Sequence, residues 1–196
     1  IHPPRNKGDL MRIENEEQPF HPIYNYALIT DSEEGLILVD VNTLADGLPR
    51  NNFLKRSLTW NENNVLDGAR HITIAGHIVY ITTPDALVVL DLNDPLSPKL
   101  LNRIKMNDPR ASALQFRYLL VTDKDGVKIF DATSPNNIKS SPVAAVPLND
   151  ARKVYIARTY AYVAAGKEGL AIIDVKNPEK PFINQIFTAD GKINDA

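Results

Sequence analysis

Three arginines follow aspartates at short, repeated spacing, and they are the residues best suited to bind a ligand. The pairs are Asp67 with Arg70, Asp108 with Arg110 and Asp150 with Arg152, and Asp195 begins a fourth. A guanidinium group binds a carboxylate or phosphate through parallel hydrogen bonds, so convergent arginines would bind a small anion. His71, directly after the first arginine, belongs to the same predicted site. Alternatively, each arginine pairs with an aspartate of its own or an adjacent repeat and fixes the register between repeats.

The sequence predicts no metal site and no cofactor. Residues 123–126, Asp-Lys-Asp-Gly, resemble the start of a calcium loop but lack its remaining oxygen ligands and closing glutamate, so they predict a tight turn. The histidines show no metal-binding spacing, and the chain has no cysteine. The histidines are His2, His21, His71 and His77.

Four further aspartates recur at the ends of short apolar runs, and we expect them to be structural. They are Asp40, Asp91, Asp131 and Asp174. An aspartate at the start of a turn accepts hydrogen bonds from nearby backbone N–H groups, and so regular a recurrence does not describe one active site. The sequence contains no nucleophile elbow, phosphate-binding loop or dinucleotide fingerprint. We therefore assign no catalytic residue.

Composition limits the class of partner. The chain of 196 residues is 43% hydrophobic and 23% charged, with a net charge of -2. This near balance of charge does not predict a nucleic-acid partner. No apolar run approaches the roughly 18–20 residues of a membrane-spanning helix, so no membrane span is expected.

The elements that must position these residues form an internal repeat. The four closing aspartates are spaced by 51, 40 and 43 residues. Each of these aspartates ends an apolar run, and a short turn separates this run from another apolar run before it. Two such runs joined by a turn predict a β-hairpin. Repeats two to four add an apolar stretch after the arginine and another after a proline, giving four short strands in about 40 residues.

The predicted fold is therefore all-β, a propeller-like array of about four antiparallel four-stranded blades belonging to a larger propeller. Runs such as Leu87–Leu90 are apolar on both faces, which suits a sheet packed between two neighbours. A β-sandwich would explain the short strands but not the matched Arg, Asp and Pro positions. A four-bladed ring that closes by itself is a further alternative.

The repeats define the predicted boundaries. The units are a connector at 1–21, blade 1 at 22–66, blade 2 at 67–107, blade 3 at 108–149, blade 4 at 150–194 and the start of a further blade at 195–196. The connector has one expected strand at Leu10–Ile13, and blade 1 contains an insertion at 46–66 around a strand at Phe53–Trp60. Because residues 194–196 copy Asn-Asp-Ala at 149–151 and no initiator Met is present, we expect a cut or processed segment of a longer protein.

The repeat unit resembles the LVIVD repeat of bacterial and archaeal β-propeller proteins. Its clearest copies are Gly76–Pro98, which contains the whole Gly-x-x-x-Tyr element, and Tyr160–Pro181, which begins at the tyrosine. In both copies a Leu-containing apolar run follows, then an Asp, and then an Asn-Pro or Asp-Pro pair. The third copy departs from the pattern, with Phe116 in place of the glycine, and the first departs at Thr43 and Leu44. The resemblance implies a surface or periplasmic module, set in a multidomain protein in an extracellular or periplasmic location.

The favoured function is a non-enzymatic binding or scaffold module. Its binding surface would be the mouth of the propeller's central channel, where the three arginines are expected to lie, together with the insertion at 46–66. The expected partners are a protein or a small anionic ligand, and other domains of the same polypeptide. The alternative is the propeller domain of an enzyme, either a hydrolase or lyase, or a redox assembly with cofactors in other domains. A unique buried group with a shifted pKa would favour the enzyme, and repeated Arg–Asp pairs would favour the scaffold.

Overall fold

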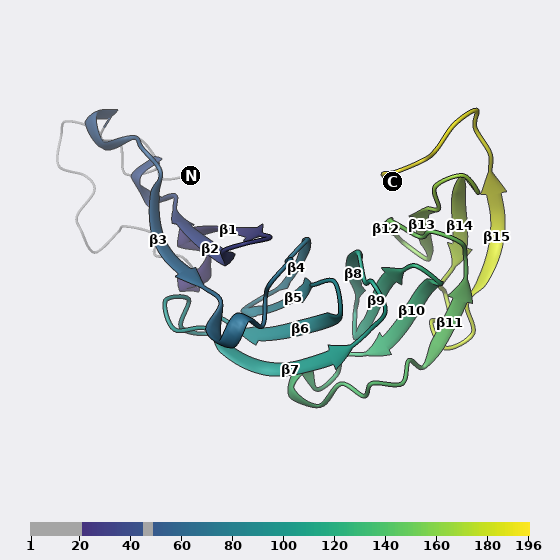
Figure 1. Ribbon diagram of the computed structural model, residues 1–196, viewed down its shortest axis with the longest axis horizontal. Helices are drawn as coiled ribbons and strands as arrows, with labels where there is room; N and C mark the ends of the chain where they lie inside the picture. The colour runs from purple at the N-terminus through teal and green to yellow at the C-terminus, as the bar shows by residue number, and fades with distance from the viewer. Residues whose placement is uncertain (1–20, 45–48) are drawn as a thin grey trace, which may run out of the picture.

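The computed structural model describes residues 21–44 and 49–196, which form four separate antiparallel sheets along an open arc (Figure 1). We call these sheets blades 1 to 4. Blade 1 contains β1 (Tyr26–Asp31), β2 (Gly35–Asp40) and β3 (Lys55–Trp60). Blade 2 contains β4 (His71–Ala75), β5 (Ile78–Thr82), β6 (Ala86–Asp91) and β7 (Lys99–Lys105).

The two remaining blades repeat the same order of strands. Blade 3 contains β8 (Ala111–Gln115), β9 (Tyr118–Asp123), β10 (Gly126–Asp131) and β11 (Ala144–Pro147). Blade 4 contains β12 (Lys153–Ala157), β13 (Tyr160–Ala164), β14 (Leu170–Asp174) and β15 (Phe182–Phe187). Each sheet is a meander in which consecutive strands pair. Five short 3-10 helices connect the strands in the described part: η2 (Pro22–Asn25), η3 (Asn42–Leu44), η4 (Pro49–Asn51), η5 (Glu62–Asn64) and η6 (Pro135–Asn137).

The predicted all-β class and blade architecture are confirmed. Separate sheets exclude the continuous β-sandwich, and the described residues follow an open arc instead of a closed four-bladed ring (Figure 1). Blade 1 has three strands among the described residues, and they correspond to the second, third and fourth strands of the other blades. The expected connector at 1–20, its strand at Leu10–Ile13 and residues 45–48 of the insertion region lie outside the described residues.

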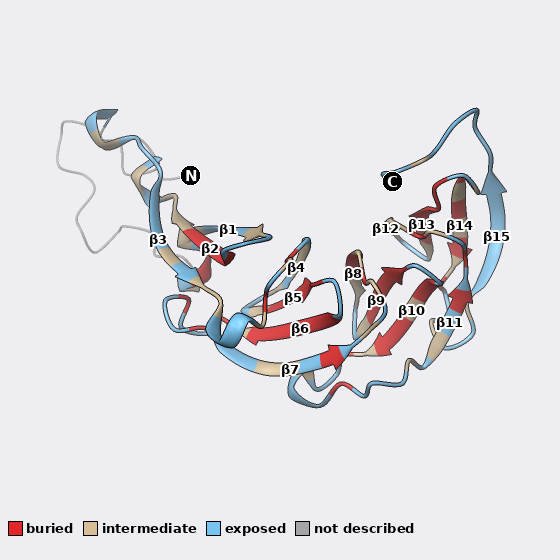
Figure 2. Ribbon diagram, in the orientation of Figure 1, coloured by how far each residue is buried: buried red, intermediate tan, exposed pale blue. Residues whose placement is uncertain are grey.

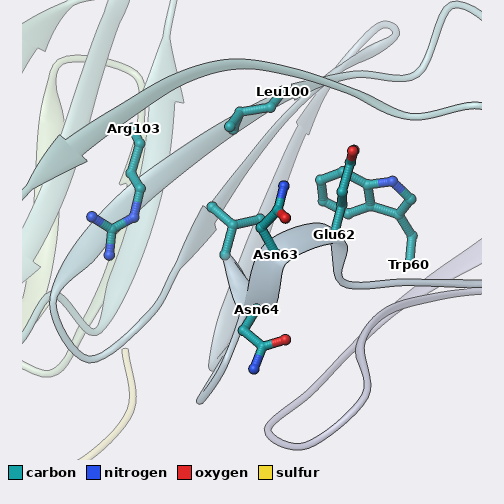
Figure 3. A pocket seen from close by; sticks show the side chains of 7 residues that line it. Trp60, Glu62, Asn63, Asn64, Leu100 and Arg103 are labelled. Atoms are coloured by element: carbon teal, nitrogen blue, oxygen red, sulfur yellow. The ribbon is translucent and has the colours of Figure 1, made fainter.

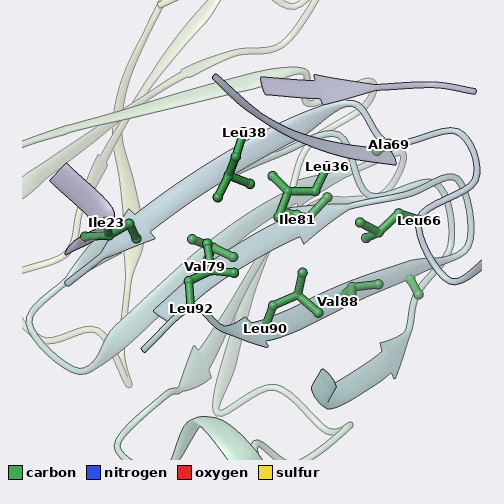
Figure 4. Close-up of a cluster of buried hydrophobic side chains, with 11 residues drawn as sticks. Ile23, Leu36, Leu38, Leu66, Ala69, Val79, Ile81, Val88, Leu90 and Leu92 are labelled. Carbon is green, nitrogen blue, oxygen red and sulfur yellow. The ribbon is translucent and has the colours of Figure 1, made fainter. Parts of the chain in front are cut away.

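The apolar core lies between the blades. One cluster joins blades 1 and 2 (Figure 4), a second joins blades 2 and 3, and a third joins blades 3 and 4. In blade 2, Val88 faces the first cluster and Leu87 and Val89 face the second, so both sides of β6 are buried (Figure 2). The run of apolar residues without alternation in this strand therefore reflects coverage on both faces.

The turns follow from local side-chain chemistry. Each closing aspartate uses Oδ1 to accept the backbone N–H two residues later, at 2.7–2.9 Å. These acceptors are Asp40, Asp91, Asp131 and Asp174. This is the structural role expected for them, because a carboxylate that holds its own turn ends the strand.

None of the helices in the described part of the chain has the length and apolarity that a membrane crossing needs.

Replacing Leu87 with alanine should test the packing between blades. Leu87 is fully buried between blades 2 and 3, so Leu87→Ala should lower the free energy of unfolding by about 2–5 kcal/mol. Leu170 holds the same position in blade 4 but is only half-buried. Leu170→Ala should therefore lower the free energy of unfolding by clearly less than Leu87→Ala does. Urea denaturation of both variants measures the difference, and equal losses would contradict this account of the core.

Candidate functional site

The three arginines of the predicted site lie at the same end of three adjacent inner strands. The backbone N–H of Arg70, Arg110 and Arg152 donates to the carbonyl at the end of the second strand of its own blade, at 2.8–2.9 Å. These carbonyls belong to Thr82, Thr122 and Ala164. Because β4, β8 and β12 lie side by side, the arginines follow one another along the inner edge of the array.

Two aspartates link these arginines into a continuous chain of ion pairs. Asp108 Oδ1 lies 2.5 Å from Arg70 Nη1, and its Oδ2 lies 3.0 Å from Arg110 Nη2. Asp150 Oδ1 lies 2.5 Å from Arg110 Nη1, and its Oδ2 lies 2.6 Å from Arg152 Nη2. We call these five residues the Arg–Asp ladder. Each aspartate bridges the arginine of its own blade to that of the preceding blade.

The backbone places the bridging carboxylates. Asp108 and Asp150 have φ angles of 57° and 64°, in the left-handed region that aspartate tolerates better than most side chains. The equivalent residue before Arg70 is Gly68, with φ of 72°. Asp67 therefore lies one residue outside the repeat position, and its Oδ1 accepts a hydrogen bond from Asn61 at 2.7 Å. The sequence grouped Asp67 with the other two aspartates, but the structure does not bring it into the ladder.

Both carboxylates of the ladder are paired with two arginines each, and the three arginines leave the ladder a net charge of +1. Hydrogen bonds from Arg70 and Arg110 lower the pKa of Asp108, and hydrogen bonds from Arg152 and Arg110 lower the pKa of Asp150. At its far end, Arg152 Nη1 donates to the side-chain amide oxygen of Asn194. Every arginine of the ladder thus already faces an oxygen partner, and this geometry matches the register-fixing alternative. The anion-binding role of these residues stays a prediction.

His71 links two blades next to the ladder. Its Nδ1 accepts the backbone N–H of Ser112 at 3.3 Å, and Thr73 Oγ1 donates to the carbonyl of Ser112 at 2.8 Å. Burial lowers the pKa of His71, and the positive charge of Lys153 lowers it further. The neutral ring is therefore the form that joins β4 to β8.

Residues 123–126 form the turn between β9 and β10. Asp123 Oδ1 accepts the N–H groups of Asp125 and Gly126 at 2.8 and 3.0 Å. A Cβ on Gly126, whose φ is 139°, would lie 2.1 Å from the carbonyl oxygen of Val146. Across residues 21–44 and 49–196, no three His, Asp or Glu side chains gather into a group that could hold a metal ion.

A pocket of about 250 Å³ opens between the outer parts of blades 1 and 2 (Figure 3). Its walls come from the end of β3, from η5 and from β7. The lining residues are Trp60, Glu62, Asn63, Asn64, Val65, Leu100 and Arg103. Five of the seven lie in the region 46–66 that the sequence predicts to bind a partner. We call this site the inter-blade pocket.

The backbone of the inter-blade pocket is locally unusual. Asn63 and Asn64 both have left-handed φ angles, 51° and 60°. Asparagine tolerates this left-handed region better than most side chains. On the opposite wall, Arg103 Nη2 is held 2.6 Å from Asp85 Oδ2. Sequence reasoning missed Leu100 and Arg103, because their strand reads as an ordinary outer strand of the repeat.

These features define a β-propeller-type array of blades joined by an inner ladder of ion pairs. The model of the LVIVD repeat family matches residues 24–45, 68–105 and 149–188. The chain belongs to the LVIVD repeat family. No curated protein matches its sequence.

Solved structures with the same fold are larger β-propellers of low sequence identity. A functionally unknown protein from Desulfotomaculum acetoxidans DSM 771 has a TM-score of 0.67 at 12% identity, over 86% of this chain and 54% of its own. The computationally designed Ika8 protein has a TM-score of 0.63 at 10% identity, over 87% and 49%. The N-terminal domain of Nup159 has a TM-score of 0.57 at 11% identity, over 85% and 42%. The chain thus spans about half the length of these three structures.

Replacing Arg110 with alanine should lower stability. Its side chain is 23% exposed and lies between two carboxylates, so Arg110→Ala removes one partner from each. We expect a loss of about 1–3 kcal/mol in urea denaturation, between the values for exposed and buried ion pairs. The control is Arg56→Ala, because Arg56 pairs with Glu34 in solvent and should matter by less than about 1 kcal/mol. Unchanged stability, with phosphate protecting the wild type but not Arg110→Ala, would instead identify an anion site.

The state of His71 should make stability depend on pH. Because its pKa in the folded chain is below the ordinary value of 6.5, protonation favours the unfolded chain. The contribution of neutral His71 to the free energy of unfolding is complete above about pH 6.5. It is lost as the pH falls towards the pKa of His71 in the folded chain. Melting temperatures between about pH 7.5 and pH 5 should fall more steeply in the wild type than in His71→Gln. If the melting temperatures of the wild type and of His71→Gln fall in parallel with pH, His71 does not titrate as its burial requires.

Proposed function

We propose that this LVIVD-repeat array is a non-enzymatic binding and scaffold domain that presents the inter-blade pocket to a small polar ligand. The observation that carries the proposal is the contrast between recurring and non-recurring polar residues. The recurring ones are engaged within the fold: Asp108 and Asp150 in the ladder, and the closing aspartates in their turns. Non-recurring polar side chains gather instead around the inter-blade pocket.

The lining of the inter-blade pocket suits a neutral, polyhydroxylated molecule. Trp60 presents an indole ring, and Val65 and Leu100 add apolar surface. Around them, the amides of Asn63 and Asn64 can each donate and accept hydrogen bonds. A short saccharide has the same combination of a C–H face and a hydroxyl rim, so we take this as the ligand class.

The causes of the pKa shifts at Asp85, Asp108, Asp150 and His71 are those expected of a scaffold. The pKa of Asp85 is lowered first by its hydrogen bond from Arg103, and those of Asp108 and Asp150 by the ladder arginines. The shift at His71 comes first from burial in the contact between blades 2 and 3. These shifts have structural causes, and repeated Arg–Asp pairs are the arrangement expected of a scaffold.

The family resemblance supports a proposal for the cellular location of the domain and for the domains beside it. We propose an extracellular or periplasmic location, with other domains of the same polypeptide as neighbours. A protein partner would meet the array at the channel mouth or at the insertion that forms the inter-blade pocket.

A ligand screen with pocket variants tests the proposal. We expect mono- and disaccharides to include a ligand that raises the melting temperature, and Trp60→Ala to weaken its binding at least about tenfold, or about 1.4 kcal/mol. Asn64→Ala should weaken binding through the lost amide. The control is Phe182→Ala, which removes an exposed aromatic ring from β15, outside the pocket. A saccharide that binds equally to wild type and Trp60→Ala, or the absence of any binding, would contradict the assignment of the pocket.

A further inference from the structure

A second pocket, of about 430 Å³, lies between the outer parts of blades 2 and 3. Its walls come from the end of β7, from β10 and from the connection between β10 and β11, and Figure 1 shows the end of β7 beside blade 3. We call it the blade 2–3 pocket. Blades 2 and 3 are each packed between two other blades of the array, so the pocket exists wherever the array ends.

The connection between β10 and β11 is longer than its counterparts in blades 2 and 4. It comprises residues 132–143, whereas residues 92–98 connect β6 to β7 and residues 175–181 connect β14 to β15. The longer connection is anchored on blade 2. Ile138 is 5% exposed in the core between blades 2 and 3, and its carbonyl accepts a hydrogen bond from Asn102 Nδ2 of β7 at 3.1 Å. Blade 3 thus departs from the repeat in a segment that is held against the neighbouring blade.

Beside this connection, blade 3 carries a charged side chain at an apolar position of the repeat. Lys128 lies three residues before its closing aspartate, as do Val88 in β6 and Ala171 in β14, which are fully buried. The side chain of Lys128 is 27% exposed, and its ammonium group pairs with the fully buried carboxylate of Asp123. Asp123 corresponds to Thr83 of blade 2. A charged pair therefore stands where blade 2 has none.

The charges at the blade 2–3 pocket favour a ligand with a single negative charge. Lys105 and Lys128 are the charged residues of its lining, which contains no carboxylate. Asp123 balances Lys128, whereas Lys105 forms no ion pair within residues 21–44 and 49–196. One positive charge is therefore left over. It matches one carboxylate better than a phosphate monoester, which carries about 1.5 to 2 negative charges at pH 7.

The remaining lining residues suit an apolar body with a polar head. Met106, Phe130 and Pro142 supply apolar surface, and a methionine sulfur packs favourably against aromatic rings. The side chains of Asn107 and Ser140 make no hydrogen bond within the described part of the chain, so both can donate to a ligand. The volume of the pocket lies in the range of roughly 300–1,000 Å³ that is typical of small-molecule sites.

We propose that the blade 2–3 pocket binds a small monocarboxylate with an aromatic body. Lys128 and Lys105 attract the carboxylate, Ser140 and Asn107 donate hydrogen bonds to it, and the apolar residues contact the ring. An ammonium group has three donors, so Lys128 can serve Asp123 and the ligand at the same time. This site is separate from the inter-blade pocket and does not depend on saccharide binding there.

Phenylacetate and its neutral amide test the proposal. Isothermal titration calorimetry of the 196-residue chain should detect phenylacetate, and phenylacetamide should bind at least about tenfold more weakly because it lacks the charge. Lys128→Met should weaken phenylacetate binding to a similar extent. The control is Lys139→Met, because Lys139 is an exposed lysine of the same connection outside the lining, and this variant should bind as the wild type does. No binding of phenylacetate, equal binding of both compounds, or equal losses in the two variants would overturn the proposal.

A double variant separates binding from folding, because Lys128→Met leaves the buried carboxylate of Asp123 without this partner. Asp123→Thr with Lys128→Val gives blade 3 the residues that blade 2 has at these positions, Thr83 and Val88. This variant should keep the circular dichroism spectrum of the wild type and bind phenylacetate at least about tenfold more weakly. Binding of wild-type strength by the double variant would contradict the role of Lys128.

Methionine methyl NMR of the wild type locates the ligand. Met106 is one of two methionines in the chain, and Met106→Leu assigns its signal. Phenylacetate should shift the methyl signal of Met106 with the same dissociation constant that calorimetry gives. Binding that leaves this signal unchanged would place phenylacetate elsewhere and refute the site.

Discussion

Each blade of this protein is a thin sheet whose two faces are apolar, and the structure depends on covering both. A single four-stranded sheet has no interior of its own, so its buried area comes from contact with neighbouring sheets. Val88 and Val89 are consecutive residues of one strand, yet both are fully buried because one faces blade 1 and the other faces blade 3. The stability of any blade is therefore a property of its neighbours as much as of its own residues.

The Arg–Asp ladder adds specific, directional contacts to this non-specific apolar packing. Apolar faces tolerate small slips, whereas Asp108 and Asp150 each contact two arginines from successive blades and so define how the blades align. The same contacts occupy the guanidinium groups that the sequence predicts to bind an anion. Binding is therefore best sought where polar groups have no counterpart in the repeat, and the inter-blade pocket around Trp60 is such a place.

Much of the fold was predictable because its determinants are local. The closing aspartates, the turn at 123–126 and the apolar runs act through neighbours in the chain, and the structure has them as expected. The sequence grouped Asp67 with Asp108 and Asp150, because spacing alone does not show which residue adopts the left-handed conformation. Gly68 adopts it instead, and the carboxylate moves out of reach.

The sequence by itself determined the repeat, the strands and the residue types that recur, since each follows from the order of side chains along the chain. Only the tertiary structure decided what those residues do. Arg110 and Asp150 are 40 positions apart in sequence, and their pairing depends on the rotation of one blade against the next. Likewise, Arg103 lines the same pocket as Trp60 because two sheets pack together, a relation between separate elements that no local pattern encodes.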